Sequence, residues 1–451
     1  MSFPRYESYK DSGVEWLNTI PSHWVDLPLK GVVSHNNDVL DERTAADYEI
    51  LYVDISSVNP IVGIASKEAM PFSSAPSRAR RRVKNGDVIV STVRTYLRAI
   101  ARINDPEENL VVSTGFCVVR PSSRVFHGFL GYLLSSSYFV DAVISHSVGV
   151  SYPAINASAL VGIKVPLPPI PEQQTISTFL DRETTKIDEL IAEQQRLIEL
   201  LKEKRLAVIS NSITKGLNPD TPMKDSGIAW LGEVPEHWSL PKLKHFTSFA
   251  GGGTPSRDNL KYWNGDIPWV SPKDMKTEII SGAEEYITQT GLENSSSSLR
   301  CAGCVLVVVR SGILKHTIPV AINEVPVALN QDMKALSFAD GSCLSMFFLR
   351  WVQGLNNLLL LVWAKQGATV ESIEHSYMAE TVIPLPPITE QQTIVAFLDY
   401  ELSKFDDLTT EAQAAITLLQ ERRTSLISAA VTGKIDVRGL IQPNTSYIKL
   451  R

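Results

Sequence analysis

Two long stretches of the chain, residues 172–213 and 390–431, carry apolar side chains at heptad spacing and contain no glycine or proline. Apolar residues that recur every seven positions over five heptads predict a coiled-coil seam. Neither helix can stand alone with such a stripe exposed to water, so we expect the two to pack on each other. The seam residues that we expect to pack are Leu180, Ile187, Leu201 and Val208 in the first stretch, and Leu398, Phe405, Leu419 and Leu426 in the second.

The sequence PLPP precedes each helical stretch, at residues 166–169 and 384–387. Thr389, with Gln392 three residues later, fits a capping box, so we expect the second helix to start there. Pro171 takes the same position in the first copy. The PLPP runs also have the composition of polyproline ligands for an SH3-like partner, but a proline stop before a helix explains them without any partner.

The chain is a tandem duplication. Residues 10–24 (KDSGVEWLNTIPSHW) and 224–238 (KDSGIAWLGEVPEHW) share nine of fifteen positions. Residues 166–181 (PLPPIPEQQTISTFLD) and 384–399 (PLPPITEQQTIVAFLD) share thirteen of sixteen. The chain must return to its origin if the copies are to be related by a pseudo-twofold axis, and we therefore expect the helices to be antiparallel.

The residues between the matched blocks have diverged, and we call them the first insert (25–165) and the second insert (239–383). They share only landmarks, such as the strand-like pair NGDVIVSTVR and AGCVLVVVR, in which a tight turn precedes a buried strand. We therefore expect an α+β fold, with two globular mixed α/β domains separated by two long antiparallel coiled-coil helices. The remaining segments are two repeat segments (1–24 and 217–238), two helical spacers (166–216 and 384–437) and a tail (438–451).

The composition is that of an ordinary folded protein, with 44% hydrophobic and 20% charged residues over 451 positions. No continuously apolar run approaches the roughly 18 residues that a membrane span needs, and the N-terminus has no apolar signal region. Four cysteines in a chain of this length do not make a disulfide framework. We expect a cytoplasmic protein without a membrane partner.

The formal net charge of −6 hides an uneven distribution. Residues 78–102 contain eight basic residues and a single acid, Asp87, whereas residues 390–423 contain seven acids and three bases. The basic cluster fits the phosphate backbone of a nucleic acid. A basic cluster is more often a solvated face than a DNA site, so charge alone does not decide between the two.

The second insert opens with a glycine-rich segment, FAGGGTPSRDNLKYWNGDIPWVSPKDMK, at residues 249–276. Glycines permit close backbone approach, and the hydroxyl and basic side chains that follow are suitable donors for phosphate oxygens. Trp263 and Trp269 are better explained as core aromatics, while Arg257 and Lys273 remain open between a surface and a DNA role. The triple glycine is not a P-loop, because no Gly-Lys-Ser/Thr follows it.

Several kinds of chemistry find no support in the sequence. The lone Cys301–Cys304 pair lacks two convincing further zinc ligands. There is no Asn/Asp-Pro-Pro-aromatic loop of an amino-methyltransferase, no G-x-G-x-x-G nucleoside motif and no convincing nuclease cluster. We therefore expect a chain that binds without catalysis, and that holds neither a metal nor a cofactor.

These features together resemble the specificity subunit of type I restriction–modification enzymes. The resemblance covers nearly the whole chain and rests on both repeated blocks. It also rests on GGGTPS with YWNGDIPWVS in residues 251–271, on VVVRSGIL at residues 307–314, and on LNQDMKAL at residues 329–336. The first insert departs from the pattern, since VDLPLKGVVSHNNDVLDERT stands where GGGTPS would be, and VVSTGFCVV where LNQDMKAL would be. The two inserts should therefore not read the same DNA.

The resemblance implies that each insert is a target-recognition domain for one half of a bipartite double-stranded DNA target. It also implies that the helices set the spacer and dock two modification subunits, which carry the S-adenosylmethionine chemistry, and that motor-nuclease subunits join for restriction. The side chains that we expect to contact DNA are Arg78, Arg80, Arg81, Arg82, Arg94 and Arg98 in the first insert, and Thr254, Ser256, Arg257, Lys261, Lys273, Arg310, Lys315, Asn330 and Gln331 in the second.

Two other classes of protein compete with this interpretation. A stand-alone DNA-modifying enzyme is disfavoured by the missing catalytic motifs. A structural coiled-coil adaptor without a DNA role leaves two large, diverged inserts on a repeated frame unexplained.

Overall fold

The computed structural model describes residues 3–14, 17–59, 62–149, 152–365, 367 and 370–440. The chain forms two compact units. Unit 1 combines residues 1–194 with residues 414–451, and unit 2 consists of residues 195–413. Each unit therefore takes in one insert together with a part of both long helices.

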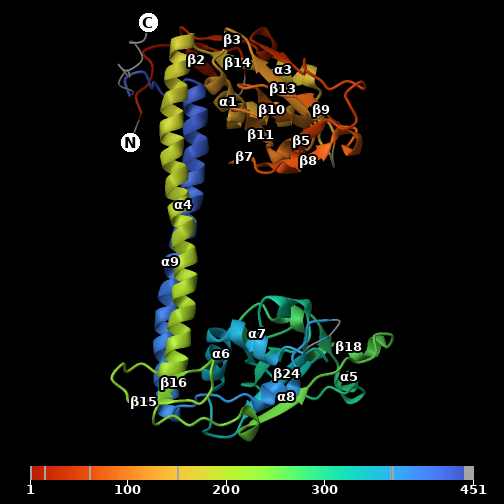
Figure 1. The fold of residues 1–451 in the computed structure, drawn as a ribbon, viewed down its shortest axis with the longest axis vertical. Helices are drawn as coiled ribbons and strands as arrows, with labels where there is room; N and C mark the ends of the chain where they lie inside the picture. Colours follow the sequence, from red (N-terminus) through yellow and green to blue (C-terminus); the bar gives the residue numbers. More distant parts are fainter. Residues whose placement is uncertain are drawn as a thin grey trace. The chain divides into compact units, whose positions relative to one another are not determined.

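Both long helices extend beyond the stretches that the heptad pattern predicted. Helix α4 comprises Ile170–Lys215 and helix α9 comprises Ile388–Val431 (Figure 1). The carbonyl groups of Pro169 and Pro387 accept the first helical hydrogen bonds. The expected capping box at Thr389 is therefore wrong, because this residue already lies in the first turn.

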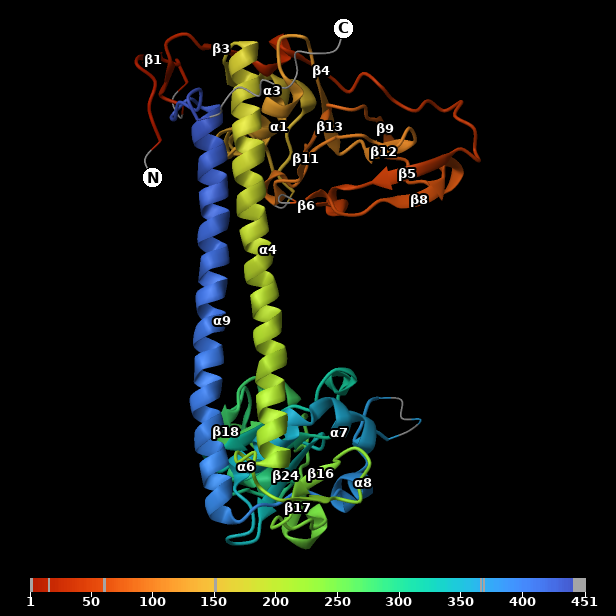
Figure 2. The ribbon, with the colours of Figure 1, turned by 60° about the vertical axis from the view of Figure 1, so that its left-hand side comes forward.

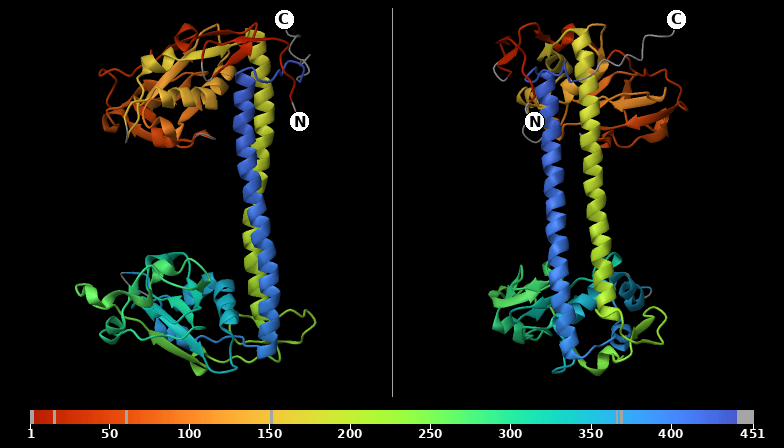
Figure 3. Two further views of the ribbon diagram at one scale, coloured as in Figure 1. Left: turned by 180° about the vertical axis from the view of Figure 1, so that it is seen from behind. Right: turned by 90° about the vertical axis from the view of Figure 1, so that its left-hand side faces the viewer.

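Within each unit the two helices lie side by side and run in opposite directions (Figures 2 and 3). In unit 1, Arg423 of α9 donates two hydrogen bonds to the carboxylate of Asp188, at 2.9 and 3.2 Å. In unit 2, Arg205 Nη1 donates to Asp406 Oδ1 at 2.6 Å. The heptad residues Leu180, Ile187, Leu201, Leu398, Phe405 and Leu426 are buried, and Val208 and Leu419 are half-buried. Leu201, Leu398 and Phe405 also belong to the hydrophobic core of the second insert.

The first insert contains two four-stranded sheets and three short helices. One sheet has the order β11-β10-β13-β4, with strands Ile100–Arg102, Val88–Ser91, Phe116–Pro121 and Val33–His35. The other has the order β8-β5-β12-β9, with strands Glu68–Pro71, Glu49–Val53, Leu110–Ser113 and Ala79–Arg82. The helices are α1 (His127–Ser135), α2 (Ser137–Ser145) and α3 (Ala157–Gly162). Two further two-stranded sheets pair β3 (Val25–Pro28) with β14 (Lys164–Leu167), and β6 (Val58–Asn59) with β7 (Gly63–Ile64).

The second insert contains a five-stranded and a three-stranded sheet. The larger has the order β17-β24-β21-β22-β19, with strands Thr247–Gly251, Met333–Phe338, Val305–Val308, Val320–Asn323 and Ile279–Ile280. The smaller has the order β20-β18-β23, with strands Tyr286–Ile287, Trp263–Val270 and Ala328–Leu329. The helices are α5 (Gln289–Glu293), α6 (Ser345–Gly354), α7 (Asn356–Trp363) and α8 (His375–Glu380).

The two inserts share one topology despite their diverged sequences. The order β11-β10-β13-β4 in the first corresponds to β22-β21-β24-β17 in the second, and β8-β5-β12 corresponds to β20-β18-β23. In these two groups of three strands, the central strands β5 and β18 each pair in parallel with one neighbour and antiparallel with the other. Strand β9, the antiparallel neighbour of β12, corresponds in the second insert to an isolated bridge between Arg300 and Val327 beside β23, and β19 extends the larger sheet beyond the shared order. The expected mixed α/β domains are therefore confirmed, and they are two versions of one fold.

No single helix among the described residues is long and apolar enough to cross a membrane. Two bent pairs, α1 with α2 and α6 with α7, reach that length together. The large apolar side chains of α1 and α6, including Phe129, Phe347 and Trp351, are buried in the cores of the inserts.

Each insert is fixed to its helix by the same two side chains of the repeated block. The buried amide of Gln173 accepts from the Phe126 N–H at 2.7 Å, and Gln391 does the same for Leu344 at 2.8 Å. At the end of the block, Asp181 accepts from the Tyr132 hydroxyl at 2.7 Å. In the second copy the equivalent Asp399 accepts from Arg350 at 3.0 Å. The repeated sequence therefore encodes the joint between helix and insert.

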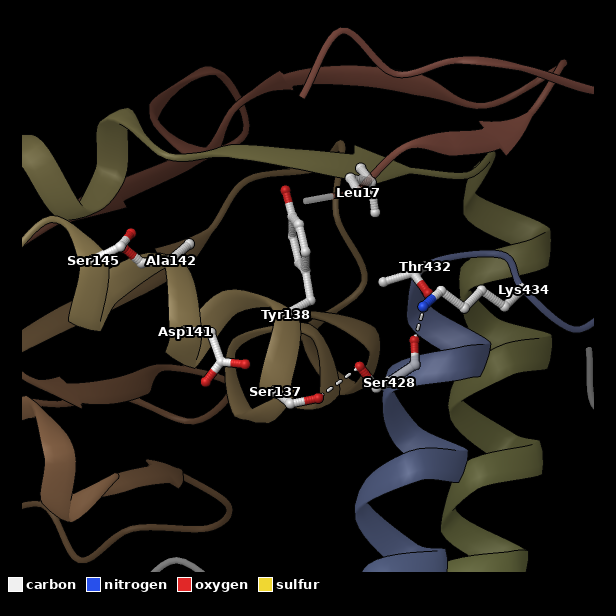
Figure 4. A pocket seen from close by; sticks show the side chains of 9 residues that line it. All are labelled: Leu17, Ser137, Tyr138, Asp141, Ala142, Ser145, Ser428, Thr432 and Lys434. Atoms are coloured by element: carbon white, nitrogen blue, oxygen red, sulfur yellow. Dashed lines mark hydrogen bonds between the residues drawn. The ribbon is translucent and has the colours of Figure 1, made fainter. Parts of the chain in front are cut away.

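A second joint in unit 1 lies between α2 and the end of α9 (Figure 4). There the Ser137 hydroxyl donates to Ser428 at 2.9 Å. A cavity of about 380 Å³ opens beside this bond, and Asp141 and Lys434 contribute its charged lining. Leu17 of the N-terminal segment also lines it, so three distant parts of the chain meet here.

The two repeated motifs meet at the helix ends. In unit 1, Glu172 accepts hydrogen bonds from the Tyr6 hydroxyl (2.7 Å) and the Trp24 indole (3.1 Å), and it pairs with His23 at 2.7 Å. Strands β1 (Tyr9–Asp11) and β2 (Thr19–Pro21) form a hairpin here, and Pro21 packs against Gly433. In unit 2, β15 (Met223–Asp225) and β16 (Glu233–Pro235) repeat the hairpin, and His237 pairs with Glu390 at 2.7 Å. The N-terminal segment thus joins the chain's C-terminal helix end.

Candidate nucleic-acid interface

The basic residues of the segment 78–102 do not lie on one continuous surface, so they cannot all contact DNA as expected from the sequence. Arg81 points inward and donates to the side chain of Asn36 and to the carbonyl of Phe116. Burial lowers the pKa of this guanidinium from its usual value. Because successive strand residues point to opposite faces, Arg80, Arg81 and Arg82 of β9 do not reach one phosphate backbone together.

The other arginines of this cluster have separate surroundings. Arg80 stacks over the ring of Phe72 at 4.7 Å, and Arg78 lies 3.8 Å from Asp54. Arg82 borders a hollow that it shares with Asp38, Asp105, Glu107 and Glu108. Arg102 packs over the ring of Tyr132 and reaches Asp181 at 3.4 Å, so it serves the joint to α4. These neighbours reduce the positive potential that the sequence alone implied.

An exposed loop after strand β10 retains its basic character. The short 3₁₀ helix η4 (Thr95–Leu97) lies between Arg94 and Arg98, and both arginines have left-handed backbone conformations, at φ of 51° and 53°. Arg94 is exposed and stacks over the ring of Tyr152, with 5.0 Å between the guanidinium carbon and the ring centroid. Non-glycine residues in this region of backbone space carry a local energetic cost, which favours a functional role for the loop.

The second insert has the same loop at the same place. Arg310 follows strand β21, and η8 (Gly312–Lys315) comes next, with Arg310, Ile313 and Lys315 exposed. The anchoring of both loops is equivalent. The N–H of Ile155 donates to the carbonyl of Thr92 in the first insert, and the N–H of Ile373 donates to that of Val309 in the second. The two loops are therefore equivalent, but their arginines lie one position apart, since Arg310 corresponds to Val93 and Arg94 to Ser311.

The glycine-rich segment of the second insert packs directly on the LNQD segment. The Gly253 N–H donates to the carbonyl of Leu329 at 2.8 Å. A Cβ atom on Gly252 would lie only 2.1 Å from the carbonyl oxygen of Asn330, so only glycine fits there. This close approach brings the Thr254 hydroxyl onto the side-chain oxygen of Gln331.

The loop of Arg310 joins the same edge. The backbone carbonyl of Asp332 accepts from the N–H groups of Val309 and Arg310, and the Arg310 guanidinium lies 3.9 Å from the Asp332 carboxylate. Three motifs far apart in sequence thus place Thr254, Arg310 and Gln331 together, all of them exposed. Asn330, by contrast, is buried, and its side-chain oxygen accepts from the Asp332 N–H at 3.0 Å, which makes it a supporting residue.

The remaining basic residues of the second insert surround two tryptophans. Trp263 and Trp269 are buried, and their indole N–H groups donate to the carbonyls of Ser256 and Gly253, so they are core aromatics as expected. Arg257 stacks over Trp263 at 3.8 Å and forms an ion pair with Glu285. Its hydrogen bond to Glu285 raises the pKa of Arg257 and lowers the pKa of the carboxylate.

Two lysines of this insert, Lys261 and Lys273, are exposed and form no ion pair with any described residue. The hydroxyl-bearing Ser256 is also exposed. These side chains are available to an anionic ligand without the loss of an existing contact, unlike Arg257.

The cysteine pair does not form a metal site. Cys301 is exposed, while Cys304 is buried and contacts the Ser337 hydroxyl at 3.1 Å. Within the described parts of the chain, no three His, Cys, Asp or Glu side chains are grouped to hold a metal ion. At the corresponding place in the first insert, Asp87 accepts two hydrogen bonds from Arg120, at 2.8 and 2.7 Å.

Comparison of the two repeats is the signal that would have separated surface arginines from structural ones. The corresponding strands β10 and β21 are each followed by an arginine in the equivalent loop, Arg94 or Arg310, whereas Arg81 and Arg102 have no basic counterpart in a corresponding strand. The comparison of the repeats does not identify the acidic partners Asp332 and Glu285, because only the fold brings them next to Arg310 and Arg257.

The fold defines a protein with two copies of one α/β domain, each with an exposed basic loop and each packed on a part of both long helices. The family model of the type I restriction modification DNA specificity domain matches residues 21–200 and again residues 235–418, and the chain belongs to this family.

Curated relatives agree with this assignment. The chain is 33% identical over 255 residues to the EcoR124I/EcoR124II specificity subunit of Escherichia coli, an alignment that covers 55% of the chain and 56% of that subunit. It is 32% identical over 193 residues to the MjaIX specificity subunit of Methanocaldococcus jannaschii, covering 42% of each chain. The HindI specificity subunit of Haemophilus influenzae is 20% identical over 417 residues, covering 80% of this chain and 89% of that one.

Two solved structures share the fold. A chain from work on complex assembly and conformational transition of the type I R-M system is 22% identical, with a TM-score of 0.73 and coverage of 91% of this chain and 98% of that one. The HsdS subunit from Thermoanaerobacter tengcongensis is also 22% identical, with a TM-score of 0.55 and coverage of 92% and 98%. These likenesses support the architecture alone.

Proposed function

We propose that this chain is the DNA-binding specificity subunit of a type I restriction–modification complex and that it performs no catalysis itself. The observation that supports this proposal is the duplication of the interface. Two specificity domains of one family each present an exposed arginine, Arg94 or Arg310, on the equivalent loop of the same fold, although the two arginines lie one position apart. Two such readers on one chain fit a bipartite DNA target, with one half-site for each insert.

The two inserts offer different side chains to the DNA. Exposed lysines, such as Lys261, Lys273 and Lys315, suit phosphate oxygens as point charges and position the protein without reading sequence. Thr254 and Gln331 suit base edges, and the first insert has no amide at the corresponding place. We therefore propose that the two half-sites differ.

The helices supply docking surface for two modification subunits and set the DNA spacer. This proposal is supported by the apolar side chains that α4 and α9 leave exposed after their seam is formed. They are Leu190, Leu197, Leu200 and Leu206 on α4, and Phe397, Tyr400, Leu408 and Leu418 on α9. Contiguous apolar patches on a protein surface mark interaction sites, and these side chains recur at helical spacing along each helix. Motor-nuclease subunits would join the assembly for restriction.

The chemistry and the location follow from these partners. The modification subunits, rather than this chain, would bind S-adenosylmethionine and transfer its methyl group to DNA. A cytoplasmic location is consistent with four cysteines that are all free thiols.

A binding and methylation experiment tests this function. The purified full chain is mixed with a pool of randomised duplexes, and methyl transfer is measured with the chain alone and with co-expressed modification subunits. We expect selection of a bipartite sequence and methylation only with the partners. Methyl transfer by the chain alone would identify an enzyme, and a chain that binds no duplex would be an adaptor.

A further inference from the structure

The side-chain amide of Gln331 is held from both ends. Its oxygen accepts from the Thr254 hydroxyl, and its Nε2 donates to Asp332 Oδ2 at 3.4 Å. Asp332 is itself fixed, since its N–H donates to Asn330 Oδ1 at 3.0 Å and its carbonyl accepts from Val309 at 2.8 Å. The amide therefore has one orientation, with the oxygen toward Thr254 and the nitrogen toward Asp332.

The amide retains one donor and one acceptor after these bonds. A glutamine side chain has two N–H donors and two lone pairs on its oxygen. Thr254 uses one lone pair and Asp332 uses one N–H, and the side chain is exposed, so the remaining N–H and lone pair face solvent. Adjacent donor and acceptor groups on one planar amide complement the N7 acceptor and the N6 amino donor of adenine in the DNA major groove.

We infer that Gln331 reads an adenine in the half-site of the second insert, and that Thr254 is the residue that positions its amide. This inference rests on the proposed DNA-binding function and adds the base that one residue recognises. A phosphate contact is disfavoured, because the acidic Asp332 lies beside the amide and repels an anion. The neighbouring Arg310 carries the positive charge at this edge, and its guanidinium lies near the same carboxylate.

The first insert lacks this reading group. Strands β23 and β24 of the second insert are joined through Asn330, Gln331 and Asp332, whereas the corresponding strands β12 and β13 are joined through Thr114 and Gly115 alone. The contact with adenine is therefore specific to the second half-site, and changes at Gln331 leave the first half-site intact.

Sequence selection from a randomised duplex pool tests the inference, using the full chain and two variants of Gln331. Gln331→Leu removes donor and acceptor at similar size. We expect it to reduce the preference for A over other bases at one position about 5- to 150-fold, the range for one bidentate base contact. Gln331→Glu keeps only acceptors, which suits the amino group of cytosine, so we expect the preference at that position to move from A toward C.

Variants of Thr254 separate positioning from folding. Thr254→Val removes the hydroxyl at equal volume, and we expect a smaller loss of the same preference. Thr254→Ser keeps the hydroxyl and should retain it. Gln289→Leu is the matched control, since this amide of the same insert binds Glu293 instead and should leave the selected sequence unchanged.

The outcomes distinguish the inference from the function on which it rests. Retained preference for A in Gln331→Leu, or an equal loss of affinity for every sequence, would overturn the role of Gln331. A wild-type chain that selects no sequence at all would overturn the proposed function itself.

Discussion

The first and second inserts have the same strand order and the same basic loop, yet they place different groups beside it. In the second insert the glycine-rich segment and the LNQD segment bring Thr254 and Gln331 next to Arg310. In the first insert the strand that corresponds to β17 leads instead into Asn36, whose side chain binds Arg81 inside the domain. The buried framework tolerates little change, whereas the exposed loops between strands vary freely.

A buried pair shows how far the framework has diverged without a change of fold. Asp87 and Arg120 bridge strands β10 and β13 in the first insert. Cys304 and Ser337 occupy the corresponding cross-strand position in the second. A charged pair and a small, weakly polar pair are thus both accommodated at this cross-strand position, because the members of each pair bind one another.

We expect the largest effect on DNA recognition from an exchange of the whole second insert. Replacement of residues 239–383 with the insert of a relative should change one half-site completely and leave the other half-site and the spacer as they were. Each wrong base pair costs about 1–3 kcal/mol, so binding to the original second half-site should be lost. Mapping of methylated sites in a host with the partner subunits measures the result, and a simultaneous change of both half-sites would refute two separate readers.

The Asp87–Arg120 and Cys304–Ser337 pairs should contribute different amounts to the free energy of unfolding. Asp87→Ala leaves the Arg120 guanidinium without its partner, and we expect a loss of about 3 kcal/mol in the free energy of unfolding, the lower end for breaking a buried ion pair, because Arg120 is partly exposed. Cys304→Ala removes only a weak contact and should cost about 1 kcal/mol or less. Urea denaturation of the full chain measures both, and equal losses would contradict the contrast.

Arginine substitutions should distinguish surface from interior within the basic cluster. Arg94→Ala and Arg310→Ala should each weaken DNA binding several-fold and leave stability unchanged; if they contact phosphate, each should also reduce the slope of affinity against salt by about one phosphate contact. Arg81→Ala should destabilise the first insert instead, since Asn36 and the carbonyl of Phe116 lose their donor. Binding titrations at several salt concentrations, with thermal unfolding as the companion measurement, would show whether the two groups behave alike.

The smallest expected effect concerns the Arg257–Glu285 pair. Arg257 lowers the pKa of Glu285 below its value in the unfolded chain. The pair therefore stabilises the fold above the unfolded pKa, and this contribution is lost as the pH falls through the lower folded pKa. Both side chains are well exposed, so solvent screening limits the contribution to about 0.2–1 kcal/mol.

Unfolding of wild type and Arg257→Ala across pH 3–7 measures this contribution. The difference in stability between the two proteins should be largest near neutral pH and should shrink in acid to the part that comes from the stacking of Arg257 on Trp263. Lys261→Ala provides a matched change of charge without an ion pair, and its stability should follow that of wild type at every pH. A difference between wild type and Arg257→Ala that grew in acid would show that the sign is wrong.

The sequence by itself determined the duplication, the two helices and their seam. The repeat is visible because the joint between helix and insert uses the same side chains twice, such as Gln173 with Gln391 and Asp181 with Asp399. The seam is visible because a heptad of apolar residues has one physical solution, burial against another helix. Local periodicity carries this information, and no distant contact is needed to interpret it.

Only the tertiary structure decided which charged residues face a ligand. Residues 78–102 look uniformly basic along the chain, yet Arg81 turns toward Asn36 and Arg102 toward Asp181, and each of these partners lies at least forty residues away. Asp332 likewise meets Arg310 and fixes Gln331 because strands β21 and β24 pair. A side chain's neighbours are set by strand pairing and loop packing between distant segments, and linear charge patterns do not encode them.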